Sequence, residues 1–427
     1  MKRGITVFMV LAVAAGAAWF LSGCEEEAVG TGMNIPEPEE VILEEFDPEL
    51  ANASNRFGFE MFRELVKEEE GDENVFISPT SIYTALAMTY NGARGETREA
   101  MEEVLGIEGV DRERFNENNL ARLYQLQEAD EEVVVNIANS LWMREEMEFD
   151  PDFVGKNENY YHASARELDF DSEEAVDIIN GWVEESTDGL IEDMVEHPID
   201  PMTVLFLINA VYFQGEWSEP FDPELTEEDV FYGPEGEIIE DVPYMHLSDD
   251  FSYLEEEKEF QAVRLPYGEE ESLAMYIFLP HEESSLTGLV EDLADGRWDS
   301  WIKEFRTMEG DLALPRFSME YEKTLDELLK QMGMEVAFDS SRADFFDMIP
   351  RDEGLNLFIS EVKHKSFIEV DEEGTEAAAA TSVEVELESA PVDYFHMEMN
   401  RPFLFLIHDR ETNEVLFTGT VADPSEQ

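Results

Sequence analysis

The chain of 427 residues is poor in cysteine and in basic residues. Its single cysteine, Cys24, cannot form an intramolecular disulfide, so the fold has to be stable without such bonds. Only 27 residues are Lys or Arg against 103 that are Asp or Glu, which gives a formal net charge of −76 at pH 7. Nucleic acid is excluded as a partner because its phosphates would be repelled by this field. Strong salt would screen the self-repulsion, so the composition is typical of a halophile.

The chain also lacks the motifs of common catalytic and nucleotide-binding sites. It contains no G-x-S-x-G, no H-E-x-x-H and no glycine-rich phosphate loop. Its seven histidines are scattered without ligand spacing, and its acidic runs are most simply solvated surface. We therefore expect no enzyme, no metal site and no cofactor. The hydrophobic content of 43% and the aromatic content of 11% nevertheless predict a packed core rather than a disordered chain.

The N-terminal residues have the pattern of an export signal. Two basic residues precede an apolar run that ends at Leu21, and the sequence Leu-Ser-Gly-Cys then ends at Cys24. This lipobox predicts that residues 1–23 are removed as a lipoprotein signal peptide and that Cys24 is lipidated on the outside of a prokaryotic cell. An uncleaved span is the alternative, because about 17 apolar residues are near the minimum for crossing a bilayer. Residues 24–47, rich in Glu, Pro and Gly, predict a flexible acidic tether.

Residues 48–427 are predicted to form one domain, since no linker or internal repeat divides them. Helical periodicity is present at 51–68, 79–92, 96–105, 173–184 and 323–333. Strand-like apolar runs are present at 133–143, 203–213, 272–280, 355–370 and 402–422. Helices mixed with largely antiparallel strands indicate the α+β class.

One segment, from Asp371 to Leu387, ends in a regular alternation of residue types. The odd positions are Thr375, Ala377, Ala379, Thr381, Val383, Val385 and Leu387, and the even positions become increasingly acidic. Because the side-chain period of a strand is two, the segment can lie in a sheet with one small-to-apolar face. Its alanines and charges would not nucleate a strand alone, so it can be a loop first and a strand later. A solvated linker or a short helix is the alternative.

Four motifs, in this order along the chain, resemble the serpin family. They are NVFISPTSIYTALAMTYNGARGET (Asn74 to Thr97), TVLFLINAVYFQGEW (Thr203 to Trp217), EVKHKSFIEVDEEGTEAAAAT (Glu361 to Thr381) and NRPFLFLIHDRETNEVLFTGTVADP (Asn400 to Pro424). The resemblance runs from about Glu49 to Pro424. It implies the serpin fold, with a large, mostly antiparallel central sheet, surrounding helices, smaller sheets and an exposed reactive-centre loop at about 372–396.

By this resemblance the chain is a suicide inhibitor of serine endopeptidases, with cysteine endopeptidases as a secondary target class. The protease forms an acyl-enzyme with the loop and is trapped when the cut loop inserts into the main sheet as an extra strand. A non-inhibitory serpin that acts as an extracytoplasmic binding or chaperone-like protein is the alternative. A generic acidic lipoprotein would explain the lipobox and the charge but not the alternating segment. We expect a monomer that meets the membrane only through its lipid anchor.

The resemblance implies a hinge at the start of the reactive loop. Its residues are Glu372, Gly374, Thr375, Ala377, Ala379 and Thr381. Gly374 permits a sharp change of backbone direction, and Thr375 is the first side chain that has to enter the sheet. The inserting face carries no charged residue and no proline, which is typical of inhibitory members of the family.

The resemblance also implies a shutter, a polar cluster beneath the main sheet. Its residues are Ser78, Ser81, Asn209 and His364. Ser78 is in addition a good helix N-cap, because a proline follows it at the first helical position. Asn209 lies in an apolar run and needs hydrogen-bond partners, which we expect His364 and the serine hydroxyls to supply. Trp217 matches the tryptophan that the family has at the top of the sheet.

The scissile bond is predicted less sharply than the hinge. Counting the usual 17 residues of the family from Glu372 places it between Glu388 and Ser389, whereas counting back from the motif at 400–403 reaches Pro391. We favour Glu388, with Leu387 as the next candidate. A Glu at this position would select glutamyl endopeptidases, and a Leu would select chymotrypsin- or subtilisin-like enzymes; the target is an extracellular protease in each case.

Overall fold

The computed structural model describes residues 46–69, 71–127, 133–234, 236–349, 357–375 and 394–426. Its helices are α2 (Pro48–Glu68), α3 (Pro79–Tyr90), α4 (Gly95–Val104), α5 (Arg112–Gln127), α6 (Pro151–Tyr161), α7 (Glu174–Ser186), α8 (Leu286–Asp292), α9 (Trp298–Trp301), α10 (Asp326–Leu329) and α11 (Glu335–Phe338). Short 3-10 or π segments are η1 (Pro223–Leu225), η2 (Leu293–Arg297) and η3 (Lys330–Met334).

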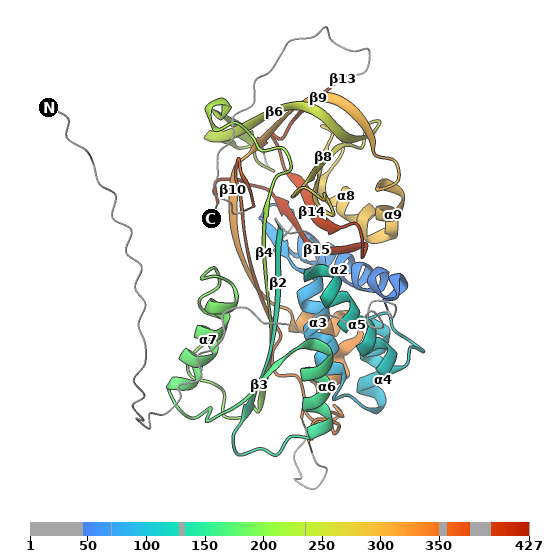
Figure 1. The fold of residues 1–427 in the computed structure, drawn as a ribbon, viewed down its shortest axis with the longest axis vertical. Coiled ribbons are helices and arrows are strands. Elements are labelled where there is room, and N and C mark those ends of the chain that lie inside the picture. The colour runs from blue at the N-terminus through green and yellow to red at the C-terminus, as the bar shows by residue number, and fades with distance from the viewer. Residues whose placement is uncertain are drawn as a thin grey trace, which may run out of the picture. The chain divides into compact units, whose positions relative to one another are not determined.

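The strands form three sheets (Figure 1). They are β1 (Val75–Ile77), β2 (Val133–Arg144), β3 (Ser164–Leu168), β4 (Leu205–Glu216), β5 (Glu227–Tyr232), β6 (Ile238–Glu256), β7 (Phe260–Pro266), β8 (Leu273–Pro280), β9 (Arg306–Pro315), β10 (Phe317–Thr324), β11 (Lys363–Val370), β12 (Gly374–Thr375), β13 (Tyr394–Glu398), β14 (Phe403–Asp409) and β15 (Glu414–Val421). The largest sheet has the order β1-β15-β14-β8-β7-β6-β9-β13, with β5 on β6. The predicted α+β class, with one large sheet and smaller ones, is confirmed.

The middle of the molecule contains two smaller sheets, β12-β4-β2-β3 and β10-β11. Antiparallel pairing joins β2 to β4 along almost their whole length, and β10 to β11 likewise. Helix α7 packs on one face of the β2–β4 pair through a cluster that includes Trp142, Ile179 and Ile208. Helix α3 lies on the opposite side, where Figure 1 shows it beside α5 and α6. Both faces of β4 are therefore covered, which explains its nearly continuous apolar sequence.

Helix starts follow local capping chemistry. The Ser78 hydroxyl accepts a hydrogen bond from the backbone N–H of Ser81 at 3.2 Å, and proline occupies the first position of α3. Asp47 and Asp150 cap α2 and α6 in the same way, each also followed by a proline. Each cap satisfies one backbone donor that the first helical turn leaves free.

Four predicted helices are present as α2, α3, α4 and α7, but the predicted helix at 323–333 has the wrong bounds. Thr324 still belongs to β10, and the helical segment after it is interrupted at Gly333, whose φ is +127°. The run at 402–422 is two strands, β14 and β15, and the strand expected from 355 begins only at Lys363. Helix α5 was not predicted because its buried side chains include Asn116, Asn119 and Arg122, which give no apolar period.

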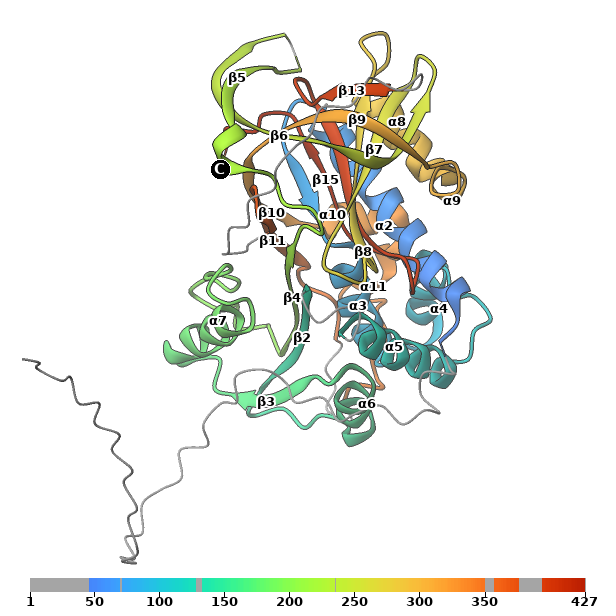
Figure 2. The same ribbon diagram turned by 45° about the horizontal axis from the view of Figure 1, so that its top comes forward.

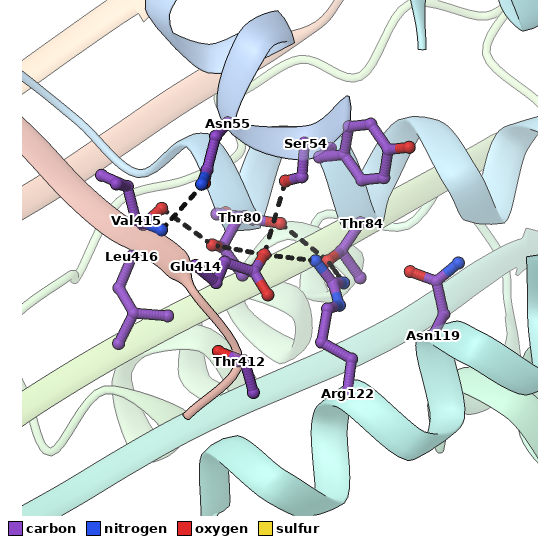
Figure 3. Close-up of polar contacts among 12 residues, drawn as sticks. Ser54, Asn55, Thr80, Thr84, Asn119, Arg122, Thr412, Glu414, Val415 and Leu416 are labelled. Atoms are coloured by element: carbon purple, nitrogen blue, oxygen red, sulfur yellow. Dashed lines mark hydrogen bonds and ion pairs between the residues drawn. The ribbon is translucent and has the colours of Figure 1, made fainter. Parts of the chain in front are cut away.

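An ion pair between Arg122 and Glu414 is buried where α5, α3 and β15 meet (Figure 3). The two side chains are 2% and 0% exposed, and Arg122 Nη1 lies 2.6 Å from Glu414 Oε1. The same carboxylate oxygen accepts the Thr80 hydroxyl at 2.9 Å, while Arg122 Nη2 donates to Thr84 Oγ1 at 2.6 Å. This ion pair therefore joins α5 and α3 to β15, the strand that runs beside the N-terminus of α3.

Replacing Arg122 with Met is expected to lower the free energy of unfolding by about 3–5 kcal/mol, because it leaves the Glu414 carboxylate buried without a cation. The double variant Arg122→Met/Glu414→Met should recover most of this loss, since no buried charge remains. Guanidinium unfolding of both variants in the same salt measures the two values. A double variant as unstable as the single one would contradict this account of the pair.

Candidate functional site

The candidate site is formed by the open edges of two central strands, by which we mean the edge of β4 that does not pair with β2 and the edge of β11 that does not pair with β10. Among the described strands, only the short β12 pairs with the open edge of β4, and none pairs with that of β11. Figure 2 shows β10 and β11 beside β4. Strand edges left in this state are templates for a further strand.

Two of the predicted hinge residues, Gly374 and Thr375, occupy one end of the open edge of β4. Gly374 pairs with Glu216 and Thr375 with Gly215, both antiparallel. The Thr375 side chain is buried, and its hydroxyl lies 2.9 Å from the Tyr267 hydroxyl. The sequence predicts that Thr375 enters the sheet when the loop inserts; in the structure it has already entered.

Gly374 is required by close backbone packing rather than by the change of chain direction alone. Its φ is +155°, and a Cβ at this position would lie 2.1 Å from the carbonyl oxygen of Gly215. No side chain fits at that distance, so any substitution would push the hinge away from β4.

The turn between β11 and β12 is held by polar contacts from three directions. The Glu372 carboxylate is buried and accepts hydrogen bonds from Arg316 and from the Thr226 hydroxyl. Burial alone would raise the pKa of Glu372, but the bonds from Arg316 and Thr226 outweigh it and hold the pKa below its ordinary value. The backbone N–H of Phe221 donates to the Glu372 carbonyl at 2.9 Å.

Trp217 lies at the end of β4 and caps this turn. Its backbone N–H donates to the Glu373 carbonyl at 2.9 Å, and its indole N–H donates to the Asp371 carbonyl at 3.0 Å. Its ring stacks on Tyr267 with centroids 4.5 Å apart. Tyr267 therefore contacts both the tryptophan and Thr375. Sequence reasoning did not identify Tyr267, Arg316 or Thr226, because each lies outside the recognised motifs.

Two of the predicted shutter residues meet directly beneath the central strands. The backbone N–H of Ser78 donates to His364 Nε2 at 3.2 Å, and the Ser78 hydroxyl donates to the Leu416 carbonyl at 2.8 Å. Ser81 contributes its backbone N–H to the Ser78 hydroxyl. His364 is buried, and this burial lowers its pKa to about 4. The ring is therefore neutral at pH 7 and accepts through Nε2.

The predicted partners of Asn209 are wrong. Its amide donates to Asn139 Oδ1 at 2.7 Å, and Asn139 in turn donates to the Tyr161 carbonyl at 2.8 Å. Asn139 is the cross-strand neighbour of Asn209 in the β2–β4 register, which explains the pairing. Asn139 also stands in a buried apolar run, so the same polar-in-apolar signal was present in its sequence. The Asn209 Oδ1 atom is buried and has no hydrogen-bond partner among the described residues.

Several predicted site residues lie outside the described part of the chain. They are Ala377, Ala379, Thr381, Leu387, Glu388, Ser389 and Cys24. Within the described ranges, no helix is long and apolar enough to cross a membrane. The same ranges contain no group of three or more His, Cys, Asp or Glu side chains that could hold a metal ion.

Comparison with known proteins gives a consistent result. A family model described as "Serpin (serine protease inhibitor)" matches residues 52–424. A serpin-like protein of Thermococcus kodakarensis is 36% identical over 396 residues, which cover 91% of this chain and 88% of that protein. Human serpin B8 is 33% identical over 386 residues, covering 88% of this chain and 100% of its own length. The crystal structure of tengpin, a thermophilic serpin, in the native state matches with a TM-score of 0.80 and 34% identity over 88% of this chain and 95% of that one.

Acid is expected to destabilise the protein through His364. The folded protein keeps this ring neutral down to a pKa of about 4, whereas the unfolded chain protonates it near its ordinary value of 6.5. The unfolded state therefore binds more protons in this window, and stability present above pH 6.5 is lost as the pH falls toward 4. Between pH 7 and pH 4, His364→Asn should lose about 3 kcal/mol less unfolding free energy than the wild type.

Denaturant unfolding at a series of pH values measures this difference. The exposed His246→Gln serves as the control and should follow the wild-type slope. If His364→Asn also follows the wild-type slope, His364 is not the group that titrates.

Proposed function

The chain belongs to the serpin family, and we propose that it inhibits serine endopeptidases by inserting its cleaved reactive loop between β4 and β11. Serpins as a family are protease inhibitors rather than catalytic enzymes, and their partners are the proteases that they inhibit. The proposal for this chain extends secondarily to cysteine endopeptidases, which also form an acyl-enzyme with the chain they cut.

The observation that carries this proposal is the position of β12. The strand follows β11 through a short turn, in which the Asp371 N–H donates to the Gly374 carbonyl at 3.0 Å, and it already pairs with β4. Its continuation would run antiparallel along the edge of β4 with which, among the described strands, only β12 pairs. Insertion would thus extend an existing strand rather than start a new one.

Extending the observed register supports the same proposal. Since Thr375 pairs with Gly215, Thr381 would come to lie opposite Asn209, with its side chain on the same face as that of Thr375. A threonine hydroxyl at that place can donate to the buried Asn209 Oδ1, which has no partner among the described residues. The residues between them on this face are Ala377 and Ala379, which add little volume and no charge.

Insertion would carry a bound protease far from its starting point. About 14 residues at roughly 3.3 Å each correspond to some 45 Å along the sheet. The energy for this movement would come from strand pairing that the uncut molecule leaves unmade, so the uncut form would be kinetically rather than globally stable.

For the scissile bond we propose Glu388–Ser389, with Leu387 as the next candidate for the residue that becomes acylated. The first choice predicts glutamyl endopeptidases as targets, and the second predicts chymotrypsin- or subtilisin-like enzymes. The alternative function, a non-inhibitory binding or chaperone-like serpin, would leave the pairing of Gly374 and Thr375 with β4 and the uncharged inserting face without a role.

The test is whether a covalent complex with a protease forms and depends on the hinge. The purified chain is incubated in molar salt with a glutamyl endopeptidase and separately with subtilisin, and the products are measured by intact mass. We expect a protease adduct and a released C-terminal peptide that begins at Ser389. Thr375→Arg should be cut without forming the adduct, because a charged side chain cannot enter the buried face beside Tyr267.

The matched control is Glu376→Arg, which introduces the same side chain one residue later on the outward-facing side of the inserted strand. It should keep most of the trapping activity. Equal trapping by Thr375→Arg and wild type would refute insertion, whereas cleavage without any adduct in the wild type would move the protein to the non-inhibitory class.

We further propose that the mature chain begins at Cys24, is lipidated there and is held outside a halophilic prokaryotic cell by the acidic segment 24–47. Only the lipobox and the composition support this location. Expression of the full chain with a labelled fatty acid in a prokaryote that processes lipoproteins should give a labelled product in the membrane fraction. Cys24→Ser should remove both the label and the membrane association; a labelled Cys24→Ser product would contradict the assignment.

A further inference from the structure

Exposed large apolar side chains gather on one hairpin of the described chain and on the turn that leads into it. Leu225 ends η1, Tyr232 ends β5 and Ile238 begins β6, and they are 51%, 48% and 62% exposed. Exposed large apolar side chains elsewhere in the described residues are spread over β2, α7 and the segment before β4; they are Val134, Ile178 and Met202. Single exposed apolar side chains are ordinary, whereas a group of them indicates a surface that contacts another molecule.

The strand register explains how two of these side chains form one surface. Tyr232 and Ile238 are directly opposite each other in the β5–β6 ladder, so their side chains lie together on the same side of the hairpin. The next pair is Phe231 and Ile239, of which Phe231 is fully buried and Ile239 packs against the same core. Because successive side chains of a strand point to opposite faces, the end of the hairpin is apolar on both its buried and its exposed face. We call Tyr232 and Ile238 the hairpin patch.

The hairpin is attached to the segment that leads out of the reactive loop. The Tyr232 N–H donates to the Asn400 carbonyl at 2.9 Å, and the Tyr244 hydroxyl of β6 donates to the Met399 carbonyl at 3.2 Å. These two carbonyls directly follow β13, the first described strand after Thr375, and Figure 2 shows β5 and β13 at the same end of the molecule. A protease that attacks the reactive loop would therefore be brought to the end that carries the hairpin patch.

The charged side chains of the hairpin are all negative. From Pro223 to Pro243 the sequence contains no Lys or Arg. Exposed carboxylates of this segment are Glu227, Glu228, Asp229, Glu237, Glu240 and Asp241. A partner that fits this surface combines an apolar contact with Lys or Arg side chains around it. A second copy of the chain would instead bring the same carboxylates together, and anionic lipid would be repelled for the same reason.

An apolar contact is also the kind of recognition that survives concentrated salt. At about 1 M salt the Debye length is only about 3 Å, so charges that are not in contact attract each other little. Burial of apolar surface is not screened in this way. In molar salt, the hairpin patch can therefore hold a partner that long-range attraction to the carboxylates no longer holds.

We propose that Tyr232 and Ile238 are a secondary docking surface for the endopeptidase that attacks the reactive loop. The matching enzyme carries an apolar surface rimmed by Lys or Arg side chains beside its active site. This inference rests on the proposed inhibitory function, because it takes the protease as the partner. The two residues determine specificity in this role: they contact the enzyme away from the scissile bond and act before the loop is cut.

The experiment measures binding before any bond is cut. A glutamyl endopeptidase and subtilisin, each with its nucleophilic serine replaced by alanine, are titrated against the full chain in molar salt. Tyr232→Thr/Ile238→Thr should bind at least one of the two enzymes about five- to tenfold more weakly than the wild type, because the apolar contact is lost. The active form of that enzyme should form its adduct more slowly by the same factor, with an unchanged yield of adduct per cleaved chain.

Three further variants separate docking from a general effect on the fold. Tyr232→Phe/Ile238→Leu keeps the apolar surface and should bind within about twofold of the wild type. Ile178→Thr/Met202→Thr removes two exposed apolar side chains away from the hairpin and should also bind like the wild type. Glu240→Lys places a cation on the same side of β6 as Ile238, and it should weaken binding more as the salt is lowered.

The proposal is overturned if Tyr232→Thr/Ile238→Thr binds both inactive enzymes as tightly as the wild type, or if the control Ile178→Thr/Met202→Thr weakens binding equally. It is also overturned if sedimentation shows a wild-type dimer in molar salt that the hairpin variant loses, because the patch then binds a second copy. Failure of the inhibitory function gives a different result. Binding to an inactive enzyme needs no acyl-enzyme, so a wild type that forms no adduct but binds through Tyr232 and Ile238 would keep the docking surface and reject the inhibition.

Discussion

Strands β4 and β11 each have one edge along which almost no described strand makes backbone hydrogen bonds. A strand edge in the middle of a domain is ordinarily filled, because unpaired N–H and C=O groups cost free energy when they are shielded from water. Among the described residues, Gly374 and Thr375 are the segment that pairs with this edge of β4, at one end of it. The hydrogen bonds made by Trp217, Tyr267 and Glu372 hold the turn and the short strand β12 at that end.

The described segments that precede and follow residues 376–393 are attached by different chemistry. At the hinge, attachment is largely buried: Thr375 bonds Tyr267, Gly374 touches the backbone of β4, and Glu372 is held by Arg316. In β13, the Tyr394 hydroxyl donates to the partly exposed Asp311 of β9 at 2.7 Å, and His396 Nδ1 lies 2.9 Å from the same carboxylate. Both segments also bury side chains, because Thr375 is buried beside Tyr267 and Phe395 and Met397 of β13 belong to the hydrophobic core.

Some of the few basic residues form ion pairs on the central strands and in the core. Lys365 on β11 pairs with Glu320 of β10 at 2.7 Å, and Lys363 pairs with Glu322 at 2.7 Å. Arg122 forms an ion pair with the buried Glu414. Salt screens exposed pairs strongly and buried pairs weakly, so in a chain of net charge −76 the buried pair is the one that keeps its strength in concentrated salt.

The sequence by itself determined the family, the α+β class and the Ser78 cap, because these depend on local motifs, periodicity and capping chemistry that neighbouring residues carry. The resemblance to the family grouped Ser78 with His364, and in the structure the Ser78 backbone N–H donates to His364 Nε2. The sequence could not assign Asn139 to Asn209 or Asp311 to His396, because those contacts are set by the register of strands far apart in the chain. Helix α5 could not be predicted either, since its buried side chains mix polar residues such as Asn119 and Arg122 with apolar ones, and Arg122 is satisfied by Glu414 from a distant strand. Hydrogen bonds across a sheet and charges buried against a distant strand are decided by the tertiary structure, because no local pattern in the chain records which partner will be opposite.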